Sequence, residues 1–149
     1  MQPSTEWHLV NWIDHVVAEY HRPLASEIAR LEHLGARVEP GTLDAALALT
    51  RELCGELLMH VRKEENVLFP WMRAGRGATA GGPVQVMTLE HQESRQIMAD
   101  IRDAAERALA TGEPAACAWA EAYLVFDARL REHMRIEEEE LFPRALAGR

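Results

Sequence analysis

Residues 60–70 of this chain read HVRKEENVLFP, and residues 133–143 read HMRIEEEELFP. Both stretches contain the pattern H-x-x-x-E-x-x-x-L-F-P. An α-helix turns about 100° and rises about 1.5 Å per residue, so residues four apart project from one face, one turn apart. Each copy can therefore direct an imidazole and a carboxylate toward one point inside a helical protein. The two pairs are His60 with Glu64 and His133 with Glu137.

Apolar residues recur at steps of three and four, and no segment shows the strict alternation of a half-buried strand. The pattern predicts an all-α protein. Its four long helices are expected from about Thr5 to Ala36, from a cap at Thr42 to about Arg73, from Pro83 to about Thr111, and from Pro114 past Leu141. Short connections between long helices favour an antiparallel up-down-up-down four-helix bundle. The length of 149 residues suits a single domain, 1–149.

The helical stripes divide the seven histidines into two groups. His21 lies four residues after Val17 and three before Leu24, and His91 lies four after Met87, so both face the interior. The two motif histidines also face inward. Counted from the shared loops, these four histidines and the two motif glutamates reach about the same level of the bundle. The remaining histidines are expected at the surface; they are His8, His15 and His33.

Buried imidazoles and carboxylates are costly unless they are paired or bind a metal ion. One inward histidine alone would be interpreted as a hydrogen-bonded core residue. Four at one depth, two of them followed by a carboxylate, indicate a metal site instead. These ligand types suit iron, manganese or zinc, and two carboxylates suit the bridging of two ions. The predicted ligands are His21, His60, Glu64, His91, His133 and Glu137.

This ligand set differs from that of ferritin-like di-iron bundles, in which two helices give a Glu and two give Glu-x-x-His. It resembles hemerythrin-like domains, and among them the bacterial di-iron proteins for repair of iron centres, also described as regulators of cell morphogenesis and nitric oxide signalling. The resemblance covers about residues 9–147 and rests on the duplicated stretches, Tyr20-His21, Glu90-His91 and the loop 80–83. Those proteins carry a small N-terminal domain with a cysteine pair, which we expect this chain to lack.

The resemblance implies a hemerythrin-like bundle that holds two iron ions with a bridging oxo or hydroxo group. It implies these ligands: His21 and His133 for one iron, His60 and His91 for the other, and Glu64 and Glu137 as bridges. It also implies that Glu56 and Glu90 line a polar route to the metals. The alternative is that both are ordinary solvated glutamates.

The function that the resemblance implies is that of a non-haem di-iron protein of the nitrosative and oxidative stress response. Such a protein would support iron-sulfur cluster repair by supplying iron, or would react with nitric oxide and release nitrous oxide. One alternative is a hemerythrin-like carrier or sensor that binds dioxygen or nitric oxide reversibly, without turnover. Another is a storage or structural site, for example for zinc, without a redox response. Whether the protein is an enzyme stays open. The expected partners are a small diatomic ligand and iron-sulfur proteins.

Composition excludes other classes of function. The net charge of −8, without a cluster of Lys or Arg, disfavours a nucleic-acid partner. No run of apolar residues is long enough for a membrane span, and residues 1–6 lack the pattern of a secretory signal. We therefore expect a cytoplasmic protein without a membrane partner. Cys54 and Cys117 are expected to be reduced, packed thiols.

Overall fold

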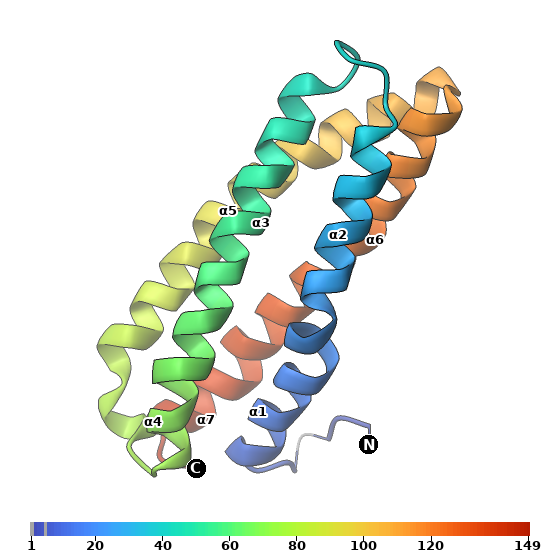
Figure 1. The fold of residues 1–149 in the computed structure, drawn as a ribbon. Helices are drawn as coiled ribbons and strands as arrows, with labels where there is room; N and C mark the ends of the chain where they lie inside the picture. Colours follow the sequence, from blue (N-terminus) through green and yellow to red (C-terminus); the bar gives the residue numbers. More distant parts are fainter. Residues whose placement is uncertain (1, 5) are drawn as a thin grey trace.

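A computed structural model, which describes residues 2–4 and 6–149, has four helical rods packed side by side (Figure 1). The rods are α1–η1–α2, α3–η2–α4, α5 alone and α6–η4–α7. Successive rods run in opposite directions, and α6 packs on α5 and α2 while α3 packs on α5. The predicted all-α four-helix bundle is confirmed. The elements are α1 (Leu9–Val16), η1 (Val17–His21), α2 (Arg22–Ala36), α3 (Asp44–Lys63), η2 (Glu64–Leu68), α4 (Phe69–Arg73), η3 (Gly77–Thr79), α5 (Gly81–Thr111), α6 (Pro114–Ile136), η4 (Glu137–Leu141) and α7 (Phe142–Leu146).

The first helix begins later than predicted. The predicted start at Thr5 lies outside the described residues, and the described helix begins at Leu9. Before it, the Trp7 N–H donates to the carbonyl of Ser4 at 3.0 Å, and His8 is extended, with φ −75° and ψ 163°. The chain therefore becomes helical only after His8. The spacing of apolar residues does not reveal this turn.

The second rod is not capped by Thr42, contrary to the prediction. Its helix begins at Asp44, and the N-cap residue, Leu43, makes no capping hydrogen bond with its side chain. Gly41 has φ 92°, a conformation that L-residues rarely adopt, and its N–H donates to Oδ1 of Asp44 at 2.9 Å. The Asp44 carboxylate thus binds the N–H of Gly41 in the preceding turn, and no side chain at the N-cap position binds the first turn of the helix.

The helix α5 begins at Gly81, two residues before the predicted start at Pro83, and the other helix ends agree with the predictions. The second rod ends at Arg73, and α5 ends at Thr111, followed by Gly112 with φ 71°. Pro114 opens α6. The side chain of Glu113, the N-cap residue, accepts hydrogen bonds from two backbone N–H groups of the first turn.

Three π-helical segments, η1, η2 and η4, interrupt the rods, and the sequence analysis did not predict them. The first ends at His21, the second begins at Glu64 and the third begins at Glu137. At the last two, the N–H groups of Phe69 and Phe142 donate to the carbonyls of Glu64 and Glu137, five residues earlier. A proline is the second residue after each segment. Because proline lacks an N–H and crowds the carbonyl four residues before it, the hydrogen-bond ladder widens just ahead. The prolines are Pro23, Pro70 and Pro143.

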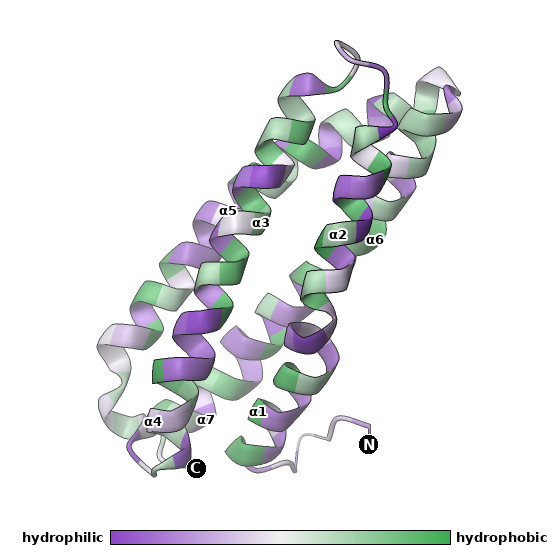
Figure 2. Cartoon of the chain, in the orientation of Figure 1, coloured by the Kyte–Doolittle hydropathy of each residue, from purple (hydrophilic) through white to green (hydrophobic). Residues whose placement is uncertain are grey.

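Buried apolar residues form two separate clusters along the bundle. One lies toward the loops that join α2 to α3 and α5 to α6, and it includes Leu53 and Trp119. The other lies toward the chain ends and includes Ile13 and Leu141. Along each rod, hydrophilic and hydrophobic residues are interspersed (Figure 2). In the described part of the chain, no helix is apolar over a length that would cross a membrane.

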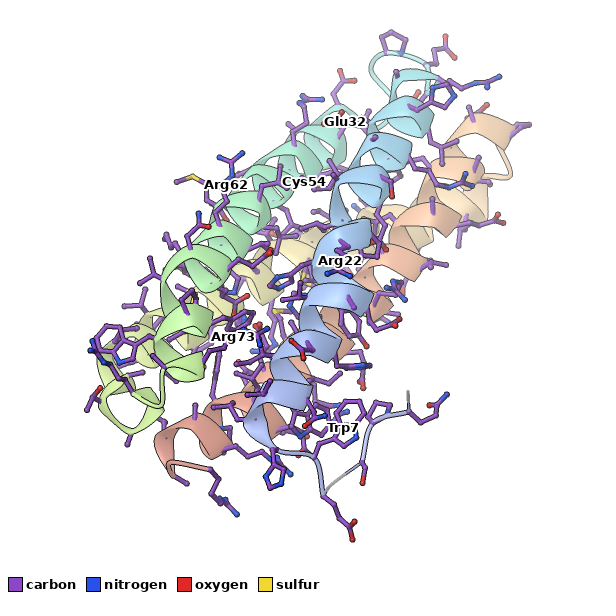
Figure 3. The ribbon with its side chains drawn as sticks, turned by 60° about the horizontal axis from the view of Figure 1, so that its bottom comes forward. Trp7, Arg22, Glu32, Cys54, Arg62 and Arg73 are labelled. Atoms are coloured by element: carbon purple, nitrogen blue, oxygen red, sulfur yellow. The ribbon has the colours of Figure 1, made fainter. Side chains whose placement is uncertain are left out.

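An ion pair links the ends of the first two rods. Nη2 of Arg73 in α4 lies 2.6 Å from Oδ1 of Asp14 in α1. The side chain of Arg73 is labelled in Figure 3. Both side chains are exposed, so this contact adds little to stability.

Candidate metal centre

All six predicted ligand residues are buried between the two apolar clusters. Their donor atoms form two groups, and within each group the atoms lie within 4.8 Å of one another. The two shared members are carboxylates, one from each duplicated stretch. Two buried clusters with both carboxylates in common fit a dinuclear metal site. The groups are His21, Glu64, His133 and Glu137, and His60, Glu64, His91 and Glu137.

The imidazole nitrogens are spaced like ligands of one ion. Nε2 of His21 lies 3.1 Å from Nε2 of His133, and Nε2 of His60 lies 3.1 Å from Nε2 of His91. Two nitrogens bound to one ion at about 2.1 Å, at right angles to each other, stand about 3.0 Å apart. The four histidines, one from each rod, therefore form two pairs of suitable spacing.

The two shared carboxylates are fully buried, and none of their four oxygens has a hydrogen-bond partner. Oε1 of Glu137 lies 3.0 Å from Nε2 of His91, and Oε1 of Glu64 lies 3.3 Å from Nε2 of His21. These contacts are close but are not aligned as hydrogen bonds. Buried carboxylates without partners are costly and rare. Oxygens left unpaired beside converging imidazole nitrogens fit the donor set of a bound cation pair.

Three of the four imidazoles are held from behind by a second carboxylate. A carboxylate can only accept, so Nδ1 is the donor in each pair, and Nε2 is the nitrogen that faces the centre and would bind an ion. Such a contact fixes the tautomer and the ring orientation of a metal-ligating histidine. The pairs are His21 with Glu65 at 3.1 Å, His60 with Glu90 at 3.1 Å and His91 with Glu138 at 3.2 Å.

Sequence reasoning missed Glu65 and Glu138. The signal was present, because each directly follows a predicted bridging glutamate, so both copies read H-x-x-x-E-E. The resemblance implies a polar route for Glu90. In the structure, its carboxylate accepts hydrogen bonds from Nδ1 of His60 and Nζ of Lys63. Glu56 is exposed and lines an open pocket of about 280 Å³ that Glu90, Lys63 and His60 also line.

The buried groups shift one another's pKa strongly. Burial alone would lower the pKa of His60, but the charges of Glu64 and Glu137 outweigh it and raise the pKa to about 11. The same opposition raises the pKa of His21 and His91. Burial would raise the pKa of Glu137, yet the facing imidazoles hold it well below its usual range. The centre therefore favours positive charge beside its carboxylates, a charge that metal ions would replace while releasing protons.

The other histidines lie away from the centre. His8 and His33 are exposed, as predicted. His15 differs, because it is partly buried and its ring makes edge contacts with Trp7 at 5.4 Å and Tyr20 at 6.0 Å between centroids. The prediction for His15 rests on its position along the helix alone. It does not include the segment before α1, in which Trp7 contacts the His15 ring.

This geometry agrees with a comparison of families. Residues 13–145 match the hemerythrin family, described as the hemerythrin HHE cation binding domain. The chain belongs to this hemerythrin family. The match spans all four rods and every residue of both buried groups.

The hemerythrin-domain chain is also homologous to proteins named iron-sulfur cluster repair protein YtfE. It is 33% identical over 161 residues to that of Dickeya chrysanthemi (strain Ech1591), which covers 99% of this chain and 72% of the relative. It is 35% identical over 152 residues to that of Salmonella schwarzengrund (strain CVM19633), and 34% over 155 residues to that of Escherichia coli O1:K1 / APEC. Each of these matches covers 94% of this chain and 67% of the relative. The chain thus spans about two thirds of the length of these relatives.

Proposed function

We propose that this hemerythrin domain holds two iron ions with a bridging oxo or hydroxo group and acts in the nitrosative and oxidative stress response. It would support iron-sulfur cluster repair, react with nitric oxide, or do both. The observation that carries the proposal is the pair of buried groups that share Glu64 and Glu137. Homology to proteins named for iron-sulfur cluster repair supports the same function.

The roles of the side chains follow from their chemistry. The four imidazoles would bind through Nε2, and the two shared carboxylates would bridge and offset part of the positive charge. The proposed pairs are those implied by the resemblance, with His21 and His133 on one iron and His60 and His91 on the other. A bound iron pair supplies one-electron redox chemistry and a position for a diatomic ligand.

The pocket lined by Glu56 and Glu90 is the proposed route from solvent to the centre. It is open to the surface and reaches His60, whose Nδ1 donates to Glu90. Lys63 pairs with Glu90 at 3.0 Å and balances its charge. A small neutral ligand such as nitric oxide or dioxygen would meet polar walls without a buried, unpaired charge.

Metal analysis of the purified protein tests the centre itself. We expect two irons per chain by mass spectrometry, and an absorption band of an oxo-bridged ferric pair that disappears on reduction. His133→Ala should hold no more than about one iron per chain and lose the band of the bridged pair, while His33→Ala, which changes an exposed histidine on the first rod, should keep two irons and the band. A colourless zinc protein without a redox response would refute the proposal.

Repair and nitric oxide chemistry need separate assays. The iron-loaded protein should restore activity to an iron-sulfur enzyme whose cluster nitric oxide has damaged, or should release nitrous oxide when its reduced form meets nitric oxide. His133→Ala should do neither, and His33→Ala should behave like the unmodified protein. A reversible dioxygen or nitric oxide adduct, with no repair and no nitrous oxide, would instead establish the carrier or sensor.

A further inference from the structure

The two duplicated stretches build the centre with an approximate two-fold relation. Each supplies a histidine, a shared carboxylate and an outer carboxylate, and then a phenylalanine that stacks on the lone histidine of another rod. Phe69 stacks on His21 with centroids 5.7 Å apart, and Phe142 stacks on His91 at 6.2 Å. Exchanging the two stretches therefore exchanges His21 with His91, and with them the two groups.

This relation breaks at the residue that precedes each lone histidine. Glu90, before His91, accepts from Nδ1 of His60. Tyr20, before His21, instead stacks its ring on His133, with centroids 5.2 Å apart and planes 15° apart. Among the residues that the structure describes, no carboxylate accepts a hydrogen bond from Nδ1 of His133.

The outer carboxylates also differ in how firmly they are held. Lys63 anchors Glu90, and Arg95 holds both oxygens of Glu138 at 3.0 and 2.5 Å. The Glu65 side chain, the counterpart of Glu138, is 40% exposed. The position between His60 and His91 thus has two anchored carboxylates behind its imidazoles. The other position has one, in contact with water.

We propose that the two metal positions have unequal affinity, and that the one between His60 and His91 fills first. The inference rests on the proposed dinuclear centre. An outer carboxylate makes its imidazole a better donor and fixes its direction, and losing one typically costs about 10–100-fold in metal affinity. Glu90 is therefore a positioning residue that acts through His60. The ion between His21 and His133 is the one that the protein can release at lower cost.

Two matched variants isolate the positions. His21→Ala leaves only the position between His60 and His91 with both imidazoles, and His91→Ala leaves only the other. Cobalt(II) is the probe, because its visible absorption reports coordination without any activity assay. Titration against a competing chelator should give an affinity about 10–100-fold higher for His21→Ala than for His91→Ala. Circular dichroism would check that both variants keep their helices.

Further substitutions test the cause of the difference. In the His21→Ala background, Glu90→Gln should weaken cobalt binding about tenfold or more. Glu93→Gln is the matched control, because exposed Glu93 lines the same pocket and the change removes the same charge. It should leave the affinity within about twofold. In the His91→Ala background, Tyr20→Glu should strengthen binding by supplying the missing carboxylate.

Equal affinities in the two variants, or equal effects of Glu90→Gln and Glu93→Gln, would overturn the inference. If a histidine variant loses its helical signal, the unmodified protein provides the test. Its cobalt titration should then show two steps, and Glu90→Gln should weaken the first. If the folded unmodified protein binds fewer than two ions, the dinuclear centre itself is contradicted. Two ions bound in one step without a change from Glu90→Gln would refute only the order of filling.

Discussion

At the scale of single residues, neighbouring glutamates of the same run differ sharply. Of the four at 137–140, Glu137 is fully buried in the centre and Glu138 supports His91. Glu139 and Glu140 each pair with an arginine four residues away on their own rod. The helical position of each glutamate decides whether its carboxylate faces the candidate metal centre or pairs with an arginine.

Glu137→Gln should remove both metal ions rather than one. Its carboxylate belongs to both buried groups, and a neutral amide neither bridges nor offsets charge as well. We expect less than one ion per chain by mass spectrometry. Glu139→Gln, which changes an exposed member of the same run, should keep two. Two ions retained in Glu137→Gln would contradict the shared role.

The thiol of Cys54 should be inert in the folded protein. Burial raises its pKa to about 12, above the usual value, so the reactive thiolate is nearly absent at about pH 8 and grows only as the pH approaches 12. In a Cys117→Ser variant, iodoacetamide should leave Cys54 unlabelled at pH 8 and label it on unfolding, as measured by intact mass. Labelling of the folded variant at the rate of a free thiol would disprove this.

At the scale of elements, the π segments adjoin the candidate metal centre. The segments η2 and η4 begin at Glu64 and Glu137, the shared carboxylates. Beyond them the rods end in α4 and α7, and η3 packs against α7. At this contact Gly77 lies against the backbone of Ala145.

Gly77→Ala should destabilise the protein. A Cβ at Gly77 would lie 2.5 Å from the carbonyl oxygen of Ala145, so backbone must shift, at a cost of about 1–3 kcal/mol in the free energy of unfolding. Gly55→Ala is the control, because Gly55 is an exposed helical position in α3 with open space around it. There, alanine should add about 0.5–1 kcal/mol. Urea unfolding followed by circular dichroism measures both; equal effects would contradict the contact.

At the scale of the whole molecule, a polar layer divides the core. The layer of four imidazoles and two carboxylates lies between the two apolar clusters, so neither cluster continues through the bundle. Apolar burial alone does not stabilise this middle section. The stability of this middle section therefore depends on the groups or ions that offset the charges of the polar layer.

Removal of the metal should lower the melting temperature. An ion present at about a thousand times its dissociation constant adds about 4 kcal/mol to the stability of the folded state. For a chain of this size that corresponds to a fall of about 10 °C on chelation, measured by calorimetry. In Glu137→Gln, which should hold little metal, the chelator should change the melting temperature by less than about 2 °C. An unchanged melting temperature in the unmodified protein would argue against a stabilising pair.

Much of the fold was predictable because helical geometry is local. The spacing of His60 and Glu64, and the stripe around His21, depend only on rotation per residue. The first turns at Leu9 and Asp44 were not predictable from spacing, because hydrogen bonds of the preceding turns set them. The π segments were missed for a related reason, because the continuous helical pattern passes through the prolines without interruption.

From the sequence alone it follows that four helices each turn a histidine inward and that two of them add a carboxylate. Spacing along one helix could not assign His21 to His133, or Glu65 to His21, and the pairing of histidines came only from the family resemblance. The tertiary structure decided which side chains meet, and it placed Glu90 behind His60 but Tyr20 against His133. The physical reason is that rotation about a helix fixes the face of a residue, whereas packing between helices fixes its partner.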